Sequence, residues 1–343
     1  MATTPPPARR IAPTLEAVAE RAGVSRATAS RVLNGATNVS QSAREAVERA
    51  SAELDYTPNL AARSLVTRRS DSVAFVVSES EDRFFDDPFF AGLLRGAHSV
   101  VAEQGIQLVF VIKSSDADAR RFINYAAGGH IDGAMLVSLH GDDPLPNRLV
   151  SLGIPTVVNG RPLGDWTGHY VDADNRGGGR MATDVLVERG SRVIATITGP
   201  RDMNASRDRL AGFRDSLKAA GIKSDRKAVV EGDYSLQGGF DAMQRLLKAV
   251  PNVDGVFVGN DLMGVGAIQA LERVGRRVPH DVAIVGFDDV PAAVLSNPPL
   301  TTVRQPIELM GQQMARMLID LIESRPVPAA LILPTSLVRR ESA

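Results

Sequence analysis

From Asp71 to about residue 285, the chain repeats one pattern, in which a short apolar run is followed by an amphipathic stretch. Runs such as SVAFVV (72–77), QLVFVI (107–112) and GAMLV (133–137) are typical of strands that are buried on both faces. The stretches between them carry apolar residues at helical spacing, as Leu93, Ala97 and Val101 do. Strands that alternate with helices predict βαβ units and parallel sheets covered by helices.

This alternation contains roughly eight or nine strands, which is more than one sheet of ordinary size holds. It falls into two series, of which the second begins near Ala173. We therefore expect an α/β core of two doubly wound, parallel-sheet subdomains that face each other across a cleft.

A different pattern occupies residues 14–34, where apolar residues recur at i, i+3, i+4 and i+7 from Leu15 onward. Thr14 can cap this helix, Gly23 can end it, and Ser25 can cap a second short helix. Two short helices joined by a glycine-containing turn predict a helix-turn-helix. The outward residues of the second helix are short or basic, as entry into a DNA major groove requires. They are Arg26, Ala27, Thr28, Ser30 and Arg31.

The alternative for this segment is an ordinary helical hairpin on a core surface, and the charge distribution argues against it. The whole chain holds 39 basic and 40 acidic residues, for a net charge of −1. Residues 1–70 hold ten Arg and six acidic residues, or +4, which leaves 29 basic and 34 acidic residues, or −5, for the rest. A basic head on an acidic body concentrates phosphate attraction at the helix-turn-helix.

Three consecutive segments carry a more specific resemblance: AGVSxxTxSRVLNG from Ala22, VSxxxRExV from Val39, and LxYxPNxxARSL from Leu54. Together they resemble the headpiece and hinge of the lactose-repressor family of bacterial transcription regulators. The resemblance implies a headpiece at 14–56 and a hinge helix or linker at 57–70, preceded by a proline-rich tail at 1–13 that we expect to be disordered. It implies DNA contacts, with Ala62 and Leu65 as a minor-groove wedge. The implied contact residues are Thr14, Leu15, Arg26, Ala27, Thr28, Ser30, Arg31, Asn34, Asn38, Ser40, Asn59, Ala62 and Leu65.

Segments in the second half of the chain, VPHDVAIVGFDDVP, NPPLTTVRQP and LPTSLVRRESA, resemble the periplasmic-binding-protein-like core of the same family. In that family the chain crosses between subdomains three times. The resemblance places these crossings near Asp172, Val303 and Ala330. It implies a first subdomain of 71–172 plus 304–328 and a second of 173–303 plus 329–343.

Ligands of open α/β sheets bind outside the carboxyl ends of the strands, and polar or aromatic residues follow several predicted strands here. Carboxylates, amides, guanidinium groups and an aromatic face are what a sugar requires. The resemblance places Arg209, Asn260 and Asp288 in the family's R-L-x-G-F, N-D-x-M and G-F-D motifs. The full set of implied effector-binding residues is Phe89, Phe90, Arg161, Arg209, Tyr234, Asn260 and Asp288.

Each of these residues also has a structural alternative, because Asp and Asn after strands cap helices and the Phe pair can belong to the core. Arg161 departs from the family, which often has an acidic residue near this position. A cationic Arg161 could therefore accept an acidic or phosphorylated effector instead of a neutral sugar.

Catalytic and metal-binding patterns are missing from the sequence. Cys is absent, and the five His are scattered without metal-ligand spacing. The run NRGGGR (175–180) is more typical of a close-packed helix entry than of a phosphate cradle, and ESEDRFFDD (79–87) lacks calcium-loop spacing and predicts a solvated loop. We expect no enzyme activity, no metal and no cofactor other than a small-molecule effector.

No 18-residue apolar run and no secretory signal are visible, so we expect a cytoplasmic protein without membrane contact. The sequence predicts a homodimeric, effector-responsive regulator, in particular a repressor, that binds a near-palindromic operator in double-stranded DNA. The alternatives are a cytoplasmic sugar-binding module without a DNA role and a regulator that depends on a corepressor or partner phosphoprotein. An enzyme on this fold is a third, disfavoured, interpretation.

Overall fold

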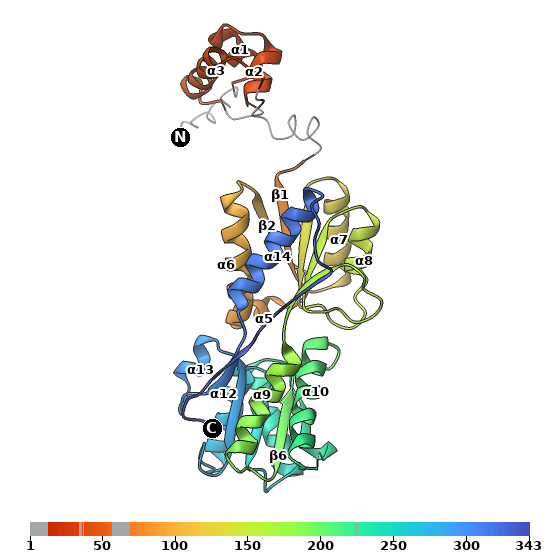
Figure 1. Ribbon diagram of the computed structural model, residues 1–343, viewed down its shortest axis with the longest axis vertical. Coiled ribbons are helices and arrows are strands. Elements are labelled where there is room, and N and C mark those ends of the chain that lie inside the picture. The colour runs from red at the N-terminus through yellow and green to blue at the C-terminus, as the bar shows by residue number, and fades with distance from the viewer. Residues whose placement is uncertain (1–12, 34–35, 37, 57–68, 224) are drawn as a thin grey trace, which may run out of the picture. The chain divides into compact units, whose positions relative to one another are not determined.

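The structure is a computed structural model that describes residues 13–33, 36, 38–56, 69–223 and 225–343 (Figure 1). The chain forms two compact units, Met1–Ser70 and Asp71–Ala343. Residues 1–12 of the predicted tail (1–13), most of the predicted hinge, and four predicted DNA contacts lie outside the described residues. These four contacts are Asn34, Asn59, Ala62 and Leu65.

The described residues of the first unit form three helices, α1 (Leu15–Ala22), α2 (Arg26–Leu33) and α3 (Gln41–Glu53). The predicted end signals act as expected: the Thr14 hydroxyl accepts a hydrogen bond from the Ala17 amide, and Gly23 ends α1 in the left-handed conformation. The Ser25 hydroxyl accepts a hydrogen bond from the Thr28 amide at 3.1 Å, which caps α2. The inward faces form one small core, made of Val18, Ala19, Ala29, Val32, Val47 and Ala50.

The first subdomain of the second unit is built on a six-stranded parallel sheet with the order β11-β5-β4-β3-β1-β2. Its strands are β1 (Ser72–Val77), β2 (Gln107–Ile112), β3 (Gly133–Val137), β4 (Thr156–Asn159), β5 (His169–Ala173) and β11 (Ala330–Leu333). Separate apolar clusters cover its two faces, one with α6 and α14 and the other with α7 and α8. The helices are α5 (Glu81–Asp86), α6 (Pro88–Glu103), α7 (Asp116–Ala127), α8 (Leu145–Ser151) and α14 (Ile307–Ile322).

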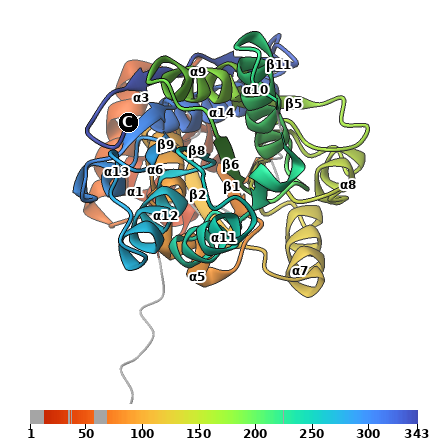
Figure 2. The same ribbon diagram turned by 90° about the horizontal axis from the view of Figure 1, so that it is seen from below.

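The second subdomain repeats this plan with the order β12-β10-β9-β8-β6-β7, in which only β12 is antiparallel. Its strands are β6 (Ile194–Thr198), β7 (Val229–Glu231), β8 (Gly255–Val258), β9 (Ala283–Asp288), β10 (Thr301–Arg304) and β12 (Ser336–Val338). Figure 2 shows α9 and α10 on one side of this sheet and α11 and α12 on the other. Its helices are α9 (Asn175–Glu188), α10 (Asn204–Ala219), α11 (Leu236–Ala249), α12 (Asp261–Arg273), the short α13 (Pro291–Leu295) and a 3-10 turn at Arg226–Ala228.

Glycines let α9 and α10 pack with their backbones in contact. A Cβ on Gly179 of α9 would lie 2.3 Å from the Arg209 carbonyl oxygen, and a Cβ on Gly212 of α10 would lie 2.0 Å from the Arg176 carbonyl oxygen. The structure therefore supports the close-packing interpretation of the NRGGGR run. This contact also fixes the backbone that carries Arg209.

Three expectations need correction. Residues 79–87 are not a plain loop, because Ser80 caps the short helix α5 within them. The third crossing lies between Leu333 and Ser336 and not at Ala330, because β11 pairs with β5 of the first sheet. The described residues contain twelve strands and not eight or nine, because β5, β10, β11 and β12 were not expected. Among the described helices, none combines the length and the apolar composition that a membrane crossing requires.

Candidate functional site

A cavity lies between the two subdomains at the carboxyl ends of their strands, where open α/β sheets bind ligands. Its volume is about 710 Å³ when the open solvent at its mouth is included. The structure brings all seven predicted effector residues to its wall. They are Phe89, Phe90 and Arg161 from the first subdomain and Arg209, Tyr234, Asn260 and Asp288 from the second.

Asp288, at the end of β9, has a buried carboxylate that is only partly satisfied by the protein. Oδ1 accepts a hydrogen bond from Gln305 Nε2 at 2.6 Å and lies 3.6 Å from Arg209 Nη1. Among the described residues, none donates a hydrogen bond to Oδ2. Burial raises the pKa of Asp288 to about 7, and the nearby Arg209 guanidinium opposes this shift. Oδ2 is thus free to accept a hydroxyl of a ligand.

The Arg209 guanidinium is held from three directions. Nε donates to Asn175 Oδ1 at 2.8 Å and Nη1 donates to the Gly259 carbonyl at 2.5 Å. The guanidinium also stacks on the Phe287 ring, with its central carbon 3.7 Å from the ring centroid. Such a rigid donor suits the recognition of paired hydroxyls.

Three of the seven described non-glycine residues with positive φ lie at the wall of this cavity. Ser138, Tyr234 and Asp288 have φ values of 59°, 67° and 107°, a region that non-glycine residues rarely adopt. Each such residue costs on the order of 1–3 kcal/mol and persists only where the surrounding structure enforces it. These backbone conformations therefore lower the folding stability and place the three residues at the cleft.

Asn260 lines the cavity, but its side chain is used by the protein itself. Oδ1 accepts the Met263 amide at the start of α12, and Nδ2 donates to the Tyr234 carbonyl at 2.9 Å. This is the helix-capping alternative raised by the sequence. Asn260 positions Tyr234, whose buried hydroxyl is 2.6 Å from the Ser206 hydroxyl.

Phe89 and Phe90 play different parts. Phe90 is 1% exposed and belongs to the core of the first subdomain, so the core alternative describes it better. Phe89 is partly buried and meets Phe90 edge to face, with ring centroids 5.5 Å apart. Phe89 therefore offers the freer aromatic surface.

Arg161 is not an unpaired cation. Its Nη2 lies 3.0 Å from Asp208 Oδ2 across the cleft, and its backbone amide donates to Asp172 Oδ2 at 3.2 Å. Asn204 Nδ2 also reaches across the cleft to the Arg161 and Pro162 carbonyls. These contacts tie the two subdomains together beside the cavity.

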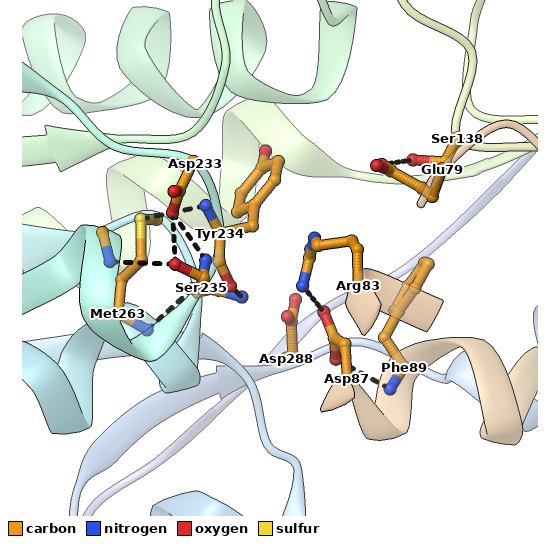
Figure 3. Close-up of polar contacts among 12 residues, drawn as sticks. Glu79, Arg83, Asp87, Phe89, Ser138, Asp233, Tyr234, Ser235, Met263 and Asp288 are labelled. Atoms are coloured by element: carbon orange, nitrogen blue, oxygen red, sulfur yellow. Dashed lines mark hydrogen bonds and ion pairs between the residues drawn. The ribbon is translucent and has the colours of Figure 1, made fainter. Parts of the chain in front are cut away.

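Sequence reasoning missed several polar residues of the cavity wall. Arg83 Nη1 lies 2.8 Å from Asp87 Oδ2, with both side chains mostly buried, and its guanidinium faces Tyr234 across the cleft (Figure 3). Burial raises the pKa of Asp87 and of Asp172. Gln305 and Asn175 follow strands, and this position could have identified them from the sequence. Nothing in the sequence indicated that Arg83 points into the cavity.

The helix-turn-helix presents the predicted base-reading face of α2 to solvent. Arg26, Ala27 and Arg31 are exposed, and Thr28 and Ser30 are half-buried. Arg26 pairs with Glu16 at 2.6 Å, whereas no ion pair between described residues includes Arg31. The other described members of the predicted DNA-contact set lie near the helix starts, and all but the half-buried Leu15 are exposed. They are Thr14, Leu15, Asn38 and Ser40.

Comparisons with known proteins agree with both units. Residues 14–59 match the bacterial regulatory proteins of the lacI family, and residues 183–343 match a periplasmic binding protein-like domain. The HTH-type transcriptional regulator CelR of Thermobifida fusca is 51% identical over 337 residues, which cover 97% of this chain and 99% of CelR. The ribose operon repressor of Escherichia coli strain K12 is 35% identical over 315 residues, or 90% of this chain and 93% of that protein.

Two solved structures show the same architecture. A complex of the transcriptional regulator CelR with cellobiose has a TM-score of 0.78 at 49% identity and covers 96% of this chain and 100% of that chain. A lac repressor dimer bound to operator and the anti-inducer ONPF has a TM-score of 0.83 at 29% identity. The match covers 96% of this chain and 98% of the lac repressor chain.

A helix-turn-helix unit followed by a two-sheet binding core defines the class: a DNA-binding transcriptional regulator with a ligand cleft, and not an enzyme. Similarity to CelR extends over nearly the full length of both proteins. The chain belongs to the lacI family of bacterial regulatory proteins.

Proposed function

We propose that this protein is a homodimeric repressor whose operator affinity is set by cellobiose or a closely related β-linked glucose oligosaccharide. One observation carries the proposal: the seven residues expected to bind an effector line a single cavity between the subdomains. The CelR–cellobiose complex, 49% identical to this chain, supports the choice of sugar.

The charges of the cavity wall favour a neutral ligand. Three cations line it, Arg83, Arg161 and Arg209, and each has a carboxylate partner: Asp87, Asp208 and Asp288 respectively. A phosphorylated ligand would need to displace one of these carboxylates. A sugar hydroxyl, in contrast, can donate to a carboxylate and accept from a guanidinium without disturbing either pair.

The roles of the site residues follow from their geometry. Asp288 Oδ2 accepts a sugar hydroxyl, Arg209 donates to a neighbouring oxygen, and the Phe89 ring covers an apolar C–H face. Asn260 and Asn175 hold Tyr234 and Arg209 in place. Arg161 stays paired with Asp208 and helps to close the cleft over the ligand.

For the DNA side, we propose that α2 enters the major groove and that Arg26 and Arg31 contact base edges. The lac repressor structure is a dimer on its operator, which supports one headpiece per operator half-site. Sequence-specific DNA binding also separates this proposal from a sugar-binding module without a DNA role. Whether sugar releases the operator or tightens the complex distinguishes induction from corepression.

Calorimetric titration of the full chain with cellobiose tests the site. We expect saturable one-site binding of cellobiose, weaker binding of the α-linked isomer maltose, and none of glucose 6-phosphate. Binding of glucose 6-phosphate in preference to cellobiose would contradict the neutral-ligand assignment. As a control, an Asp288→Ala variant should lose cellobiose binding while it retains operator binding.

A further inference from the structure

A carboxylate–imidazole–carboxylate chain spans the cleft outside the effector cavity. His140, just after β3 in the first subdomain, has Nε2 3.1 Å from Glu79 Oε1 and Nδ1 3.1 Å from Asp202 Oδ2. Asp202 belongs to the second subdomain, in the loop between β6 and α10. Both ring nitrogens of His140 are thus occupied by carboxylates, one from each subdomain.

This arrangement requires a doubly protonated ring. A neutral imidazole carries one N–H, whereas ionised carboxylates only accept hydrogen bonds, so both contacts are satisfied together only by the imidazolium. The hydrogen bond to Glu79 is the largest influence that raises the pKa of His140, and Asp202 adds to it, while partial burial opposes the shift.

Contacts within the first subdomain hold Glu79, which is one end of this carboxylate–imidazole–carboxylate chain, and these contacts do not cross the cleft. Ser138 donates to Glu79 Oε1 at 2.5 Å (Figure 3). The Ser114 hydroxyl donates to the Glu79 carbonyl at 2.9 Å. The link to the second subdomain consists of the His140–Asp202 pair and a bond from the Gly141 amide to the Asp202 carbonyl at 2.9 Å. Opening of the cleft would therefore break the Asp202 contacts and leave the Glu79 contacts in place.

We propose that His140 and Asp202 form a proton-dependent latch that holds the cleft shut over the effector. Neither residue lines the effector cavity, but each is adjacent in sequence to residues that do, Leu139 and Met203. The two are therefore positioning residues, which favour the closed arrangement without touching the ligand. The latch rests on the proposed function, because it assigns to the same site a dependence on pH.

Other charged groups near the ring favour its protonation. Lys113 is neutralised by Asp143 at 2.5 Å. In the two hollows that border His140, the remaining groups are mostly acidic: Asp116 and Asp142 on one side, and Asp82, Arg83, Asp86 and Asp233 on the other. Of these, Arg83 is paired with Asp87.

The sign of the pH effect follows from this raised pKa. Breaking the Asp202 contacts removes part of the upward shift, so the pKa of His140 is higher in the closed cleft than in the open one. The latch is complete below the ordinary histidine pKa of about 6.5 and is lost as the pH rises through the value in the closed cleft. Since the pair is partly exposed, we expect a modest effect, about threefold to tenfold in effector affinity.

Cellobiose affinity of the full chain, measured by calorimetry from pH 5.5 to 8.5, tests the latch. Asp288 also titrates in this range, so the contribution of His140 is the difference between the wild-type profile and that of His140→Gln. We expect His140→Gln and Asp202→Asn each to weaken binding about threefold to tenfold at pH 6, and their double variant to add little more. Near pH 8.5 these variants should bind cellobiose with the affinity of the wild type. His130→Gln, which alters an exposed histidine outside the cleft, should reproduce the wild-type profile.

A ligand-free measurement separates the latch from the proposed sugar. Because the chain has no Cys, spin labels on Arg120→Cys of α7 and Lys248→Cys of α11 can report the distance between subdomains. We expect the wild-type distance distribution to broaden toward open forms when the pH rises from 6 to 8.5. The distance distribution of His140→Gln should be the same at pH 6 and at pH 8.5. Distributions that are equally pH-independent in wild type and variant would overturn the latch. Failure of wild type to bind cellobiose would instead overturn the proposed function.

Discussion

At the scale of single residues, the buried carboxylate of Asp288 lowers the folding stability near neutral pH. Its pKa is raised to about 7 by burial, so the attraction of Arg209 and the hydrogen bond from Gln305 do not compensate for the loss of hydration. An acid whose pKa is higher in the folded state than in the unfolded state loses folding stability as the pH rises from about 4 to about 7. The carboxylate is therefore retained at a cost in stability, which a binding role explains.

This leads to a prediction for the ligand-free protein. Asp288→Asn should raise the thermal midpoint at pH 8 by at least about 2–4 °C, the shift that about 1 kcal/mol produces in a domain of this size. At pH 5 the gain should be small, because Asp288 is already protonated there. Calorimetric melting at both pH values checks it, with Asp281→Asn as the control. Arg277 lowers the pKa of Asp281 to about 2, so that substitution should act equally at pH 5 and pH 8. An equal effect of Asp288→Asn at both pH values would contradict the raised pKa.

A second residue-scale prediction concerns the two arginines of α2. Arg26 must leave its contact with Glu16 to reach a base, whereas Arg31 has no described ion pair to break. We expect Arg31→Ala to weaken operator binding by about 1–3 kcal/mol and Arg26→Ala to weaken it less. Fluorescence anisotropy with an operator duplex at fixed salt measures both, and Arg49→Ala on α3 serves as a charge-matched control. The reverse order of the two effects would show that Arg26 is the main base-reading residue.

At the scale of elements, the close packing of α9 against α10 sets the position of Arg209. Gly212→Ala would place a methyl group 2.0 Å from the Arg176 carbonyl oxygen, so the helices must separate. Overpacking of this kind costs typically about 1–3 kcal/mol. We expect lower stability in urea and weaker cellobiose binding, because Arg209 moves with α10. Lys218→Ala, on an exposed position of the same helix, should change neither. A Gly212→Ala variant with wild-type affinity would show that Arg209 tolerates the shift.

Elements buried on both faces could be predicted from the sequence, and those defined by tertiary contacts could not. β1 and β3 match their predicted bounds because each is a largely apolar, buried run. β11 was assigned to the wrong subdomain, since its pairing with β5 depends on where the chain returns after α14. The helix α5 is short and charged, and it depends on the Ser80 cap and on Phe84 packing against Phe90, so no periodicity announced it.

The same distinction applies to the site. Motifs at strand ends identified the residues around the cavity, because the topology of parallel sheets brings those ends together. Their partners were not predictable: the Arg161–Asp208 and His140–Asp202 pairs join segments that only the closed cleft makes neighbours. The sequence therefore identified the cavity, but neither its neutral charge balance nor the contacts that close it.

At the scale of the whole molecule, the proposed regulation requires that the angle between the subdomains respond to the ligand. Asp288 and Arg209 belong to the second subdomain, whereas Phe89 and Arg161 belong to the first. A ligand that contacts both sets favours one angle by its differential affinity, and such coupling typically amounts to about 1–3 kcal/mol. The first subdomain follows the headpiece in the chain, and the proposed function requires operator binding by the headpiece to depend on this angle.

Titration of the operator complex with cellobiose measures the coupling between the cleft and the operator. By anisotropy at fixed salt, saturating cellobiose should change the operator dissociation constant of the full chain by about 5-fold to 150-fold, and maltose at the same concentration should change it much less. The Asp288→Ala variant should bind operator as wild type does and show no response. An operator affinity that stays the same from zero to saturating cellobiose, in a protein shown by calorimetry to bind the sugar, would contradict coupling between the effector cleft and the operator.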